Sequence, residues 1–512
     1  MAELKTLFRH SSQYLTGRVA GMAIGIISFP ILTRVFSVAD YGLLSLVMKI
    51  AALATVLSKM GLQNSVQRFY HEHVSSPDRN AVKRFYSTFL FGAAMLAGAV
   101  MTAFVVGLYG LPNTILSSGM RKVLVLASGL IFVRALQSIV MGFLRAEQRT
   151  KAFNIMDVAT RASILALICL VLVAWKLNVQ NVLLVTLGIE AAAVAVVVLL
   201  LFRRGVVKLS EFDRKLFWVA LMFGFPMVGY EAAGFILDSG DRILLQHYLG
   251  LQAVGYYSAG YNMTSYISDS LIYSVSLALF PIYMRLWVNE GRAPTQAFLN
   301  NALDKFLLVA MCILAGVAAT ARDAIVVLGS HKLLAAYPLL PVLMIGLMIY
   351  TLHIFLNVGL LLYKKTYTMA KLITLAAVLN VVLNVILIPR IGLQGAAIAT
   401  LVSYAVFVVL LGRASFALLP LRFNVPGCLR YALAAVAGAF VATRVECASA
   451  LVSLILRGGI CLAVYVAALW LMDSSFRAMI ADAIRLVTAA RRDSGPASRL
   501  GIGSALEARP GR

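Results

Sequence analysis

The sequence predicts an all-α polytopic membrane protein with about 14 transmembrane helices, and three observations support this prediction. Hydrophobic residues make up 61% of the chain and charged residues 13%, whereas soluble domains are roughly half apolar and about a quarter charged. Apolar runs long enough to span a bilayer recur from Tyr14 to Met472. The net charge of +24 comes from Lys and Arg scattered through short loops, which indicates membrane topology and no nucleic-acid partner.

Apolar windows and their flanking charges define the individual helices. The predicted helices span residues 14–36, 39–60, 82–109, 121–143, 153–175, 179–203, 215–249, 253–283, 299–320, 335–363, 366–388, 392–417, 427–444 and 449–472. The last of these is the least regular, because Arg457 shortens its apolar length. We interpret residues 1–210 and 211–420 as two six-helix bundles and residues 421–473 as two additional transmembrane helices.

Residues 474–512 follow the last transmembrane helix and have two parts. The first part is amphipathic, and its composition favours a helix on the inner leaflet. Its apolar face contains Phe476, Ile480, Ala483, Ile484 and Val487, and its other faces contain Arg477, Arg485, Arg491 and Arg492. The final residues have too little apolar surface to fold, so we expect a disordered cytoplasmic tail.

The basic residues also predict the orientation of the chain. Lys and Arg gather at one set of helix ends, as in the loop with Arg203, Arg204 and Lys208, and are sparse in the opposite loops. Cytoplasmic loops hold Lys and Arg in excess. Both termini are therefore expected in the cytoplasm.

The hydropathy pattern indicates an internal duplication. With an offset of 213 residues, four residues of the first half meet identical residues of the second. These are Leu32, Gly42, Ser45 and Tyr70, which match Leu245, Gly255, Ser258 and Tyr283. The copies are offset by six helices and enter the membrane in the same direction, so they form a parallel repeat. Such repeats enclose a central cavity between two bundles.

The short turns at these repeats and the segment from Asn380 to Thr400 resemble polysaccharide-repeat (Wzx-like) flippases of the multidrug/oligosaccharidyl-lipid/polysaccharide exporter superfamily. The most specific piece reads N-x3-N-x4-P-x2-G-x2-G-A-A-x-A-T, and the resemblance covers roughly residues 10–417. Pro389 and the glycines of this segment also have a structural interpretation, in which they end one helix and start the next.

The resemblance implies a function and a set of partners. The function is alternating-access export of an undecaprenyl-diphosphate-linked oligosaccharide to the periplasmic leaflet of a bacterial inner membrane. The exported unit serves surface polysaccharide synthesis, as O-antigen, capsule or exopolysaccharide. The partners are membrane lipids, a polysaccharide polymerase and chain-length proteins. No cofactor is implied, and a proton or sodium gradient is the candidate energy source.

Ionisable residues inside the helices are the candidate site residues, because each costs roughly 3 kcal/mol to insert and is expected to face the bundle interior. Arg18, Lys49 and Arg134 are candidate contacts for the diphosphate, since their cations pair with phosphate oxygens. Arg18 has an alternative role, because it could snorkel to lipid phosphates. Tyr266 and Tyr273 lie seven residues apart on one helical face and are candidates for stacking on sugar rings.

Glu231, Asp238 and Arg242 fall on one face of the predicted helix 215–249. The structural interpretation is a charge pair between Asp238 and Arg242, which are four residues apart. The functional one is an ion or proton site with Glu231 as the free carboxylate. Asp157 and Arg161 repeat the same spacing, while Glu190 and Asp269 show no partner in the sequence. Gly17, Gly21 and Gly25 form a stripe that permits close helix packing.

Three other functions compete with the proposed one. A multidrug antiporter has the same architecture but recognises organic cations, and the intramembrane Lys and Arg weigh against it. A lipid II flippase would also bind a diphosphate, so sequence separates it poorly. A membrane polymerase, ligase or glycosyltransferase usually places its catalytic groups in a large outer loop, whereas every outer loop here is short. We find no catalytic triad, nucleotide-binding motif or metal-ligand spacing, so no enzyme activity is predicted.

Overall fold

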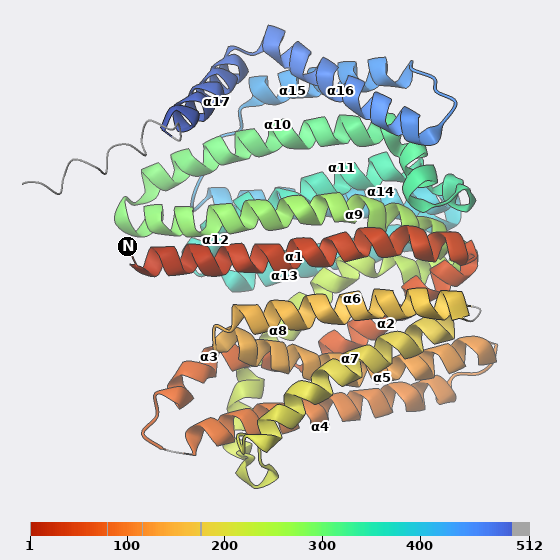
Figure 1. The fold of residues 1–512 in the computed structure, drawn as a ribbon, viewed down its shortest axis with the longest axis vertical. Helices are drawn as coiled ribbons and strands as arrows, with labels where there is room; N and C mark the ends of the chain where they lie inside the picture. Colours follow the sequence, from red (N-terminus) through yellow and green to blue (C-terminus); the bar gives the residue numbers. More distant parts are fainter. Residues whose placement is uncertain (1, 79, 115, 175–176, 494–512) are drawn as a thin grey trace, which may run out of the picture. The chain divides into compact units, whose positions relative to one another are not determined.

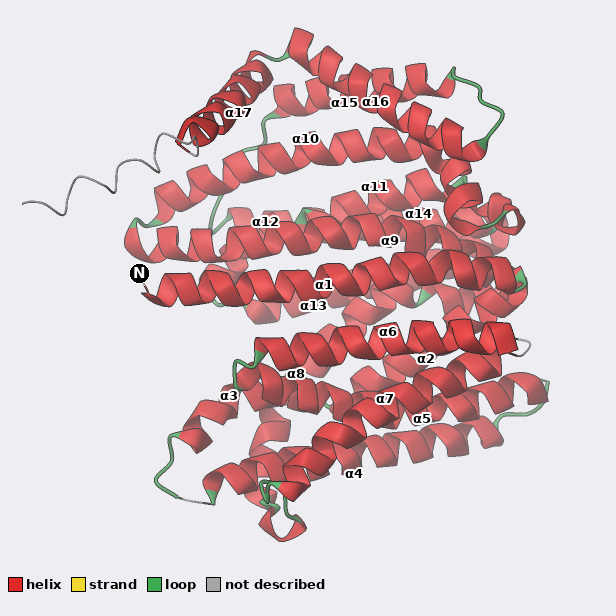
Figure 2. Cartoon of the chain, viewed as in Figure 1, coloured by secondary structure: helices red, strands yellow, loops and turns green. Residues whose placement is uncertain are grey.

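The structure, a computed structural model, describes residues 2–78, 80–114, 116–174 and 177–493, and within these ranges it is built of helices without strands (Figures 1 and 2). Thirteen segments of the described chain are long and apolar enough to cross a membrane. All 14 predicted helices overlap these segments. The numbers differ because the single segment Arg214–Asn289 contains two predicted helices. The predicted fold class is confirmed.

The first half of the chain forms long helices joined by short turns. They are α1 (Ala2–Val35), α2 (Val38–Lys59), α3 (Leu62–Val74), α4 (Ala81–Gly110), α5 (Ser118–Ala146), α6 (Thr150–Ala174) and α7 (Val179–Arg203), followed by the 3-10 turn η1 (Leu209–Glu211). Side-chain caps start several of these helices, as at Ser37, whose hydroxyl accepts a hydrogen bond from the backbone N–H of Asp40.

The second half continues with helices of 10 to 49 residues. They are α8 (Arg214–Ser239), α9 (Asp241–Asn289), α10 (Arg292–Ala324), the π-helical turn η2 (Ile325–Gly329), the 3-10 turn η3 (His331–Ala336), α11 (Leu339–Thr351), α12 (His353–Leu362), α13 (Thr366–Ile391), α14 (Leu393–Phe416), α15 (Val425–Thr443), α16 (Ala450–Met472) and α17 (Ser474–Asp493). Gly392 adopts a positive φ of 63° between α13 and α14, a conformation that favours glycine. Pro389 lies inside the last turn of α13.

Helix α3 has no counterpart among the predicted helices. Its sequence, LQNSVQRFYHEHV, is too polar for an apolar window, although it forms a regular helix. Met60 and Gly61 both have a positive φ and turn the chain between α2 and α3. The turn places Gly61 directly against Gly224 of α8, where an added Cβ would lie 2.0 Å from the carbonyl oxygen of Gly224.

Two predicted helices are interrupted in the structure. The predicted helix 215–249 ends at Ser239, and α9 starts at Asp241 and is kinked at Gly250, where φ is 81°. The predicted helix 335–363 is divided between α11 and α12. Apolar windows do not detect such breaks, because the side chains remain apolar while the backbone changes direction.

Helices α2 and α9 come from different halves of the chain and pack closely together. Gly42 of α2 meets the α9 backbone, and a Cβ added there would lie 2.1 Å from the carbonyl oxygen of Leu251. A Cβ added at Gly255 would lie 2.1 Å from the carbonyl oxygen of Val38. Both glycines belong to the proposed repeat, and both are required for the close approach of the two helices.

The chain divides into two compact units. The first comprises residues 1–300 and 321–421, and the second comprises residues 301–320 and 422–512. In the second unit, Tyr465 donates its hydroxyl hydrogen to the carbonyl oxygen of Leu308 over 2.7 Å, and Tyr431 donates to the carboxylate of Asp304 over 3.1 Å. Buried tyrosines therefore connect α15 and α16 to the central part of α10.

Helix α17 provides the helix expected after residue 473. Phe476 is buried, whereas Arg477 and Arg485 are exposed, which agrees with the predicted amphipathic character. The side chains of Ala483, Ile484, Val487, Arg491 and Arg492 and the predicted disordered tail, residues 494–512, lie outside the described residues.

Candidate functional site

A cavity of about 900 Å³ lies among six helices of the first unit, α1, α2, α5, α6, α7 and α9. All five residues predicted as substrate contacts line it, namely Arg18, Lys49, Arg134, Tyr266 and Tyr273. They come from α1, α2, α5 and α9, so the folded chain brings together positions that are remote in sequence. Their contact with a substrate stays a prediction.

The glycine stripe of α1 forms part of the cavity wall. An ideal Cβ at Gly17 would lie 2.5 Å from the side chain of Asn154 on α6, and one at Gly25 would lie 3.2 Å from the ring of Tyr266 on α9. The hydroxyl of Tyr266 donates a hydrogen bond to the carbonyl oxygen of Gly25 over 3.3 Å. The stripe thus permits close packing, as predicted, and positions two polar side chains at the cavity.

Arg134 of α5 forms a two-point ion pair with Glu190 of α7. Its Nε lies 2.9 Å from Oε2 of Glu190, and its Nη2 lies 3.0 Å from Oε1. Glu190 is 8% exposed, so the carboxylate depends on Arg134 for compensation of its charge. Glu190 therefore has a partner that the sequence did not reveal, because the two residues are 56 positions apart.

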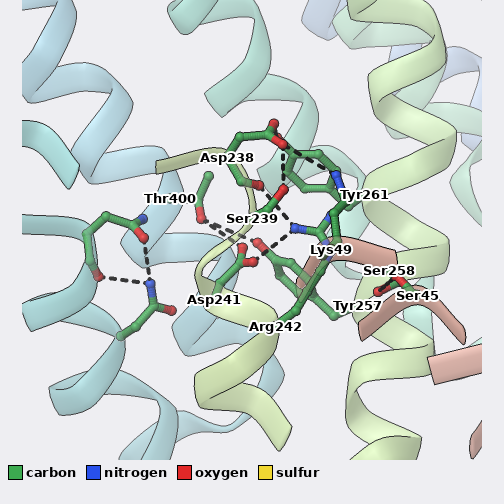
Figure 3. Close-up of polar contacts among 12 residues, drawn as sticks. Ser45, Lys49, Asp238, Ser239, Asp241, Arg242, Tyr257, Ser258, Tyr261 and Thr400 are labelled. Carbon is green, nitrogen blue, oxygen red and sulfur yellow. Dashed lines mark hydrogen bonds and ion pairs between the residues drawn. The ribbon is translucent and has the colours of Figure 1, made fainter. Parts of the chain in front are cut away.

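Lys49 of α2 pairs with Asp238 at the end of α8, with its Nζ 3.5 Å from the carboxylate (Figure 3). The same carboxylate accepts hydrogen bonds from the hydroxyls of Ser239, over 2.6 Å, and Tyr261. This ion pair connects α2 with α8. It also places Lys49, a residue of the cavity wall, beside the carboxylate of Asp238, which the sequence spacing paired with Arg242.

The predicted pairing of the Asp238 carboxylate with Arg242 is wrong. Arg242 instead pairs with Asp241, and its Nη1 donates to the Asp241 carboxylate and to the backbone carbonyl of Asp238, each over 3.0 Å (Figure 3). The spacing rule fails because α8 ends at Ser239 and a new helix begins at Asp241. Asp238 and Arg242 are four residues apart in sequence, but they lie on different helices, so the spacing rule for one helix does not apply to them.

Arg242 is the largest fully buried side chain of the described residues. Its guanidinium lies 4.5 Å from the ring centre of Tyr261 and 5.6 Å from that of Tyr257. Tyr257 approaches Thr400 to 3.3 Å between their hydroxyl oxygens, and Thr400 donates to Asp241 over 3.5 Å (Figure 3). Thr400 is the last residue of the motif that carries the family resemblance. The motif therefore contributes a side chain to the buried cluster around Asp241 and Arg242.

Glu231 is not the free carboxylate that the functional interpretation of this helix face requires. Its oxygens accept hydrogen bonds from Lys59 over 3.2 Å, Gln63 over 2.7 Å and Asn64 over 3.2 Å. The unexpected helix α3 and the end of α2 supply these donors. Among the described residues, Glu231 is not part of the cavity lining.

The cavity wall includes residues beyond the five predicted substrate contacts. Arg161 lines the cavity and forms the expected ion pair with Asp157 over 3.1 Å. Arg145, Asn154 and Asn262 also line it. Arg145 lies in the last turn of α5, where the sequence does not distinguish it from the other basic residues of the loops, and no sequence pattern distinguishes the two asparagines from ordinary polar residues.

These features define a class of protein. A membrane-spanning helical bundle surrounds a cavity with several cations in its wall, which is the arrangement of a membrane transporter. The family model described as "Polysaccharide biosynthesis protein" matches residues 7–287, more than half of the chain. The chain belongs to this family.

Relatives were found among bacterial and archaeal proteins. An uncharacterised membrane protein of Methanocaldococcus jannaschii is 29% identical over 198 residues, 38% of each chain. The succinoglycan biosynthesis transport protein ExoT of Rhizobium meliloti is 30% identical over 121 residues, 24% of each chain. A probable low-salt glycan biosynthesis flippase of Haloferax volcanii is 25% identical over 178 residues, 35% of this chain and 37% of that protein. The matches thus span well under half the length of these relatives.

Solved structures show the same fold. The inward closed conformation of the lipid II flippase MurJ superposes with a TM-score of 0.71 and 15% identity, covering 92% of this chain and all of that one. An inward-facing multidrug resistance MATE family transporter of the MOP superfamily gives a TM-score of 0.62 and 12% identity, covering 83% of this chain and 98% of that one. The similarity shows that the chain has the same fold as these two proteins.

Proposed function

We propose that this protein is a flippase for a lipid-linked oligosaccharide. It would carry an undecaprenyl-diphosphate-linked glycan from the cytoplasmic to the periplasmic leaflet by alternating access, for surface polysaccharide synthesis. The observation that supports the proposal best is the convergence of Arg18, Lys49 and Arg134 on one cavity inside a membrane-spanning bundle. The family, and relatives named as a transport protein and a flippase, support the same function.

The physical argument begins with the substrate. Its glycan and phosphates cannot cross hydrocarbon unaided, so a carrier must offer them a polar cavity while the prenyl chain stays in lipid. Intramembrane cations are costly to insert and are kept where they have a role. Arginine and lysine bind phosphate oxygens without a change of protonation. A cavity of about 900 Å³ lies in the range of small-ligand pockets and is large enough for a few sugar units.

The composition of the wall favours this substrate over an organic cation. Of its charged residues, five are basic, Arg18, Lys49, Arg134, Arg145 and Arg161, and two are acidic, Asp157 and Glu190. A multidrug antiporter for organic cations needs the opposite balance. A lipid II flippase would present the same diphosphate chemistry, and it remains the second candidate because the solved structure of MurJ has the same fold.

The proposal includes a cellular setting. We place the protein in the bacterial inner membrane with both termini in the cytoplasm, because basic residues gather in one set of loops. A proton or sodium gradient is the proposed energy source. A polysaccharide polymerase and chain-length proteins are the proposed partners, since the exported unit must be polymerised on the outer side.

A deletion strain tests the proposal. Lipid-linked intermediates are extracted from spheroplasts before and after treatment with an impermeant glycosidase or periodate. Loss of the protein should cause one lipid-linked glycan to accumulate in a form that the impermeant reagent does not reach, and plasmid-borne protein should restore access. A deletion strain with an unchanged intermediate profile and normal surface polysaccharide would contradict the proposal.

A further inference from the structure

The cations of the cavity wall differ in whether a carboxylate neutralises them. Three are paired: Arg134 with Glu190 at 2.9 Å, Arg161 with Asp157 at 3.1 Å, and Lys49 with Asp238 at 3.5 Å. Among the described residues, no ion pair includes the other two, Arg18 and Arg145. Within the part of the chain that the structure describes, the cavity wall therefore contains two arginines that form no ion pair with a carboxylate.

Aromatic rings hold the two unpaired arginines in place. The guanidinium of Arg18 lies 5.7 Å from the ring centre of Tyr273, and that of Arg145 lies 5.1 Å from the ring centre of Phe153. Both arginines are exposed in the structure. Arg18 also acts electrostatically on the carboxylate of Asp269, although the described residues include no ion pair between the two. A ring orients a guanidinium without consuming its hydrogen-bond donors.

The two arginines lie at the same end of the cavity. Gly17, the neighbour of Arg18, packs on the side chain of Asn154, and Phe153, the neighbour of Asn154, contacts Arg145. Arg134 lies eleven residues before Arg145 on α5, which is about 16 Å along a helix axis. Its Nη2 lies 3.9 Å from Sδ of Met48, the neighbour of Lys49. Because the side chains of Arg134 and Lys49 are 21% and 30% exposed and Arg145 is exposed, the two paired cations lie in a deeper part of the cavity than Arg145.

We propose that the cavity has two subsites, a diphosphate subsite at Arg18 and Arg145 and a deeper subsite for an uncharged glycan. This inference rests on the proposed function and adds to it the class of sugar that is carried. A phosphate binds most strongly to a cation that has no carboxylate partner, because a paired cation must first separate from its carboxylate. Acidic sugars would meet the carboxylate of Glu190 in the deeper subsite and would be disfavoured.

The neutral part of the cavity lining supports an uncharged ligand. Besides its ion pairs, the cavity wall presents neutral hydrogen-bonding side chains that match sugar hydroxyls. They are Gln137, Ser138, Thr160, Thr186 and Asn262. Because Glu190 balances Arg134 through two hydrogen bonds, this region offers donors and acceptors without a net charge.

A binding measurement tests the diphosphate subsite. Full-length protein in phosphatidylcholine nanodiscs is titrated with undecaprenyl diphosphate, undecaprenyl monophosphate or phosphatidylglycerol. R18Q and R145Q should each weaken diphosphate binding about tenfold, the value of one charge-assisted contact, and R18K and R145K should retain part of it. Arg203, an exposed arginine near the end of α7 that is outside the cavity lining, supplies the control variant R203Q, which should bind normally.

The outcomes separate this inference from the proposed function. Wild-type protein that does not bind undecaprenyl diphosphate would overturn the proposed function. If wild-type protein binds undecaprenyl diphosphate and both R18Q and R145Q bind it as well as R203Q does, only the diphosphate subsite is overturned. Equal losses for undecaprenyl diphosphate and phosphatidylglycerol would show a site for membrane headgroups, which also overturns the assignment.

A second titration tests the sugar specificity. The ligands are undecaprenyl diphosphate carrying one glucose, which is neutral, or one glucuronic acid, which is anionic. Wild-type protein should favour the glucose form by about fivefold or more, the effect of one unfavourable charge contact. E190Q leaves Arg134 without its carboxylate and should shift the preference toward glucuronic acid. Equal binding of the two ligands by wild-type protein, or an unchanged preference in E190Q, would overturn the uncharged-glycan subsite.

Discussion

The hydroxyl of Ser45 on α2 donates a hydrogen bond to the hydroxyl of Ser258 on α9 over 2.8 Å, and the two residues are 213 positions apart (Figure 3). This separation equals the offset of the proposed repeat. Residues related by a two-fold axis touch each other only when they lie next to that axis. The contact therefore supports a parallel repeat whose axis passes between α2 and α9.

The first prediction concerns this contact. Cysteines at both positions, Ser45→Cys with Ser258→Cys, should form an intramolecular disulfide under mild oxidation, because the two hydroxyl oxygens are already in contact. A protease site introduced at Gly205, between η1 and α7, allows the measurement, since the linked halves migrate as one band until reductant is added. Each single cysteine variant is the control. Separate halves in the oxidised double variant would contradict the close approach of α2 and α9.

The second prediction concerns the buried charge cluster. Asp241→Asn should lower the free energy of unfolding by about 3–5 kcal/mol, because it leaves the fully buried Arg242 without its ion-pair partner. Adding Arg242→Gln should recover much of the loss. Asp238→Asn should cost about 1 kcal/mol or less, since the side chains of its pair with Lys49 are 45% and 30% exposed.

Thermal unfolding in detergent and abundance in the membrane fraction measure these costs. Asp238→Asn serves as the matched comparison, because it removes a neighbouring carboxylate of the same chain segment. If Asp238→Asn proved more damaging than Asp241→Asn, the assignment of Arg242 to Asp241 would be incorrect.

The third prediction separates transport from architecture at the ion pair of Arg134 and Glu190. Arg134→Gln alone should reduce protein abundance, because Glu190 is then buried without compensation. Arg134→Gln combined with Glu190→Gln should restore abundance but not export, whereas Arg134→Lys should retain part of the export. Surface polysaccharide, normalised to membrane protein, is the readout. Full export by the double variant would assign the pair a purely structural role.

The fourth prediction concerns orientation. A single cysteine at Asn113, between α4 and α5, or at Ser330, between η2 and η3, should react with an impermeant maleimide in intact cells. A cysteine at Ser76, between α3 and α4, should react only after lysis. The basis is the excess of Lys and Arg in the loops assigned to the cytoplasm. The reverse labelling pattern would invert the topology and leave the fold unchanged.

Apolar composition was sufficient to predict the membrane class and the approximate positions of the spanning helices. Each apolar run must be buried in lipid, and its length is set by the thickness of the bilayer, so this information is local. Helix α3 was missed for the same reason, since its residues are mostly polar. The break at Ser239 was missed as well, because hydropathy does not report a change in backbone direction.

The sequence by itself determined which residue types are costly in a membrane, and so it selected Arg18, Lys49 and Arg134 as candidates. Helical spacing added Tyr266 and Tyr273. Only the tertiary structure decided that they line one cavity and which carboxylate each cation meets. Glu190 lies 56 residues from Arg134, and Asp238 pairs with Lys49 on another helix. Ion pairs depend on distances in space, and helix packing between remote segments sets those distances, so local spacing assigned Asp238 to the wrong partner.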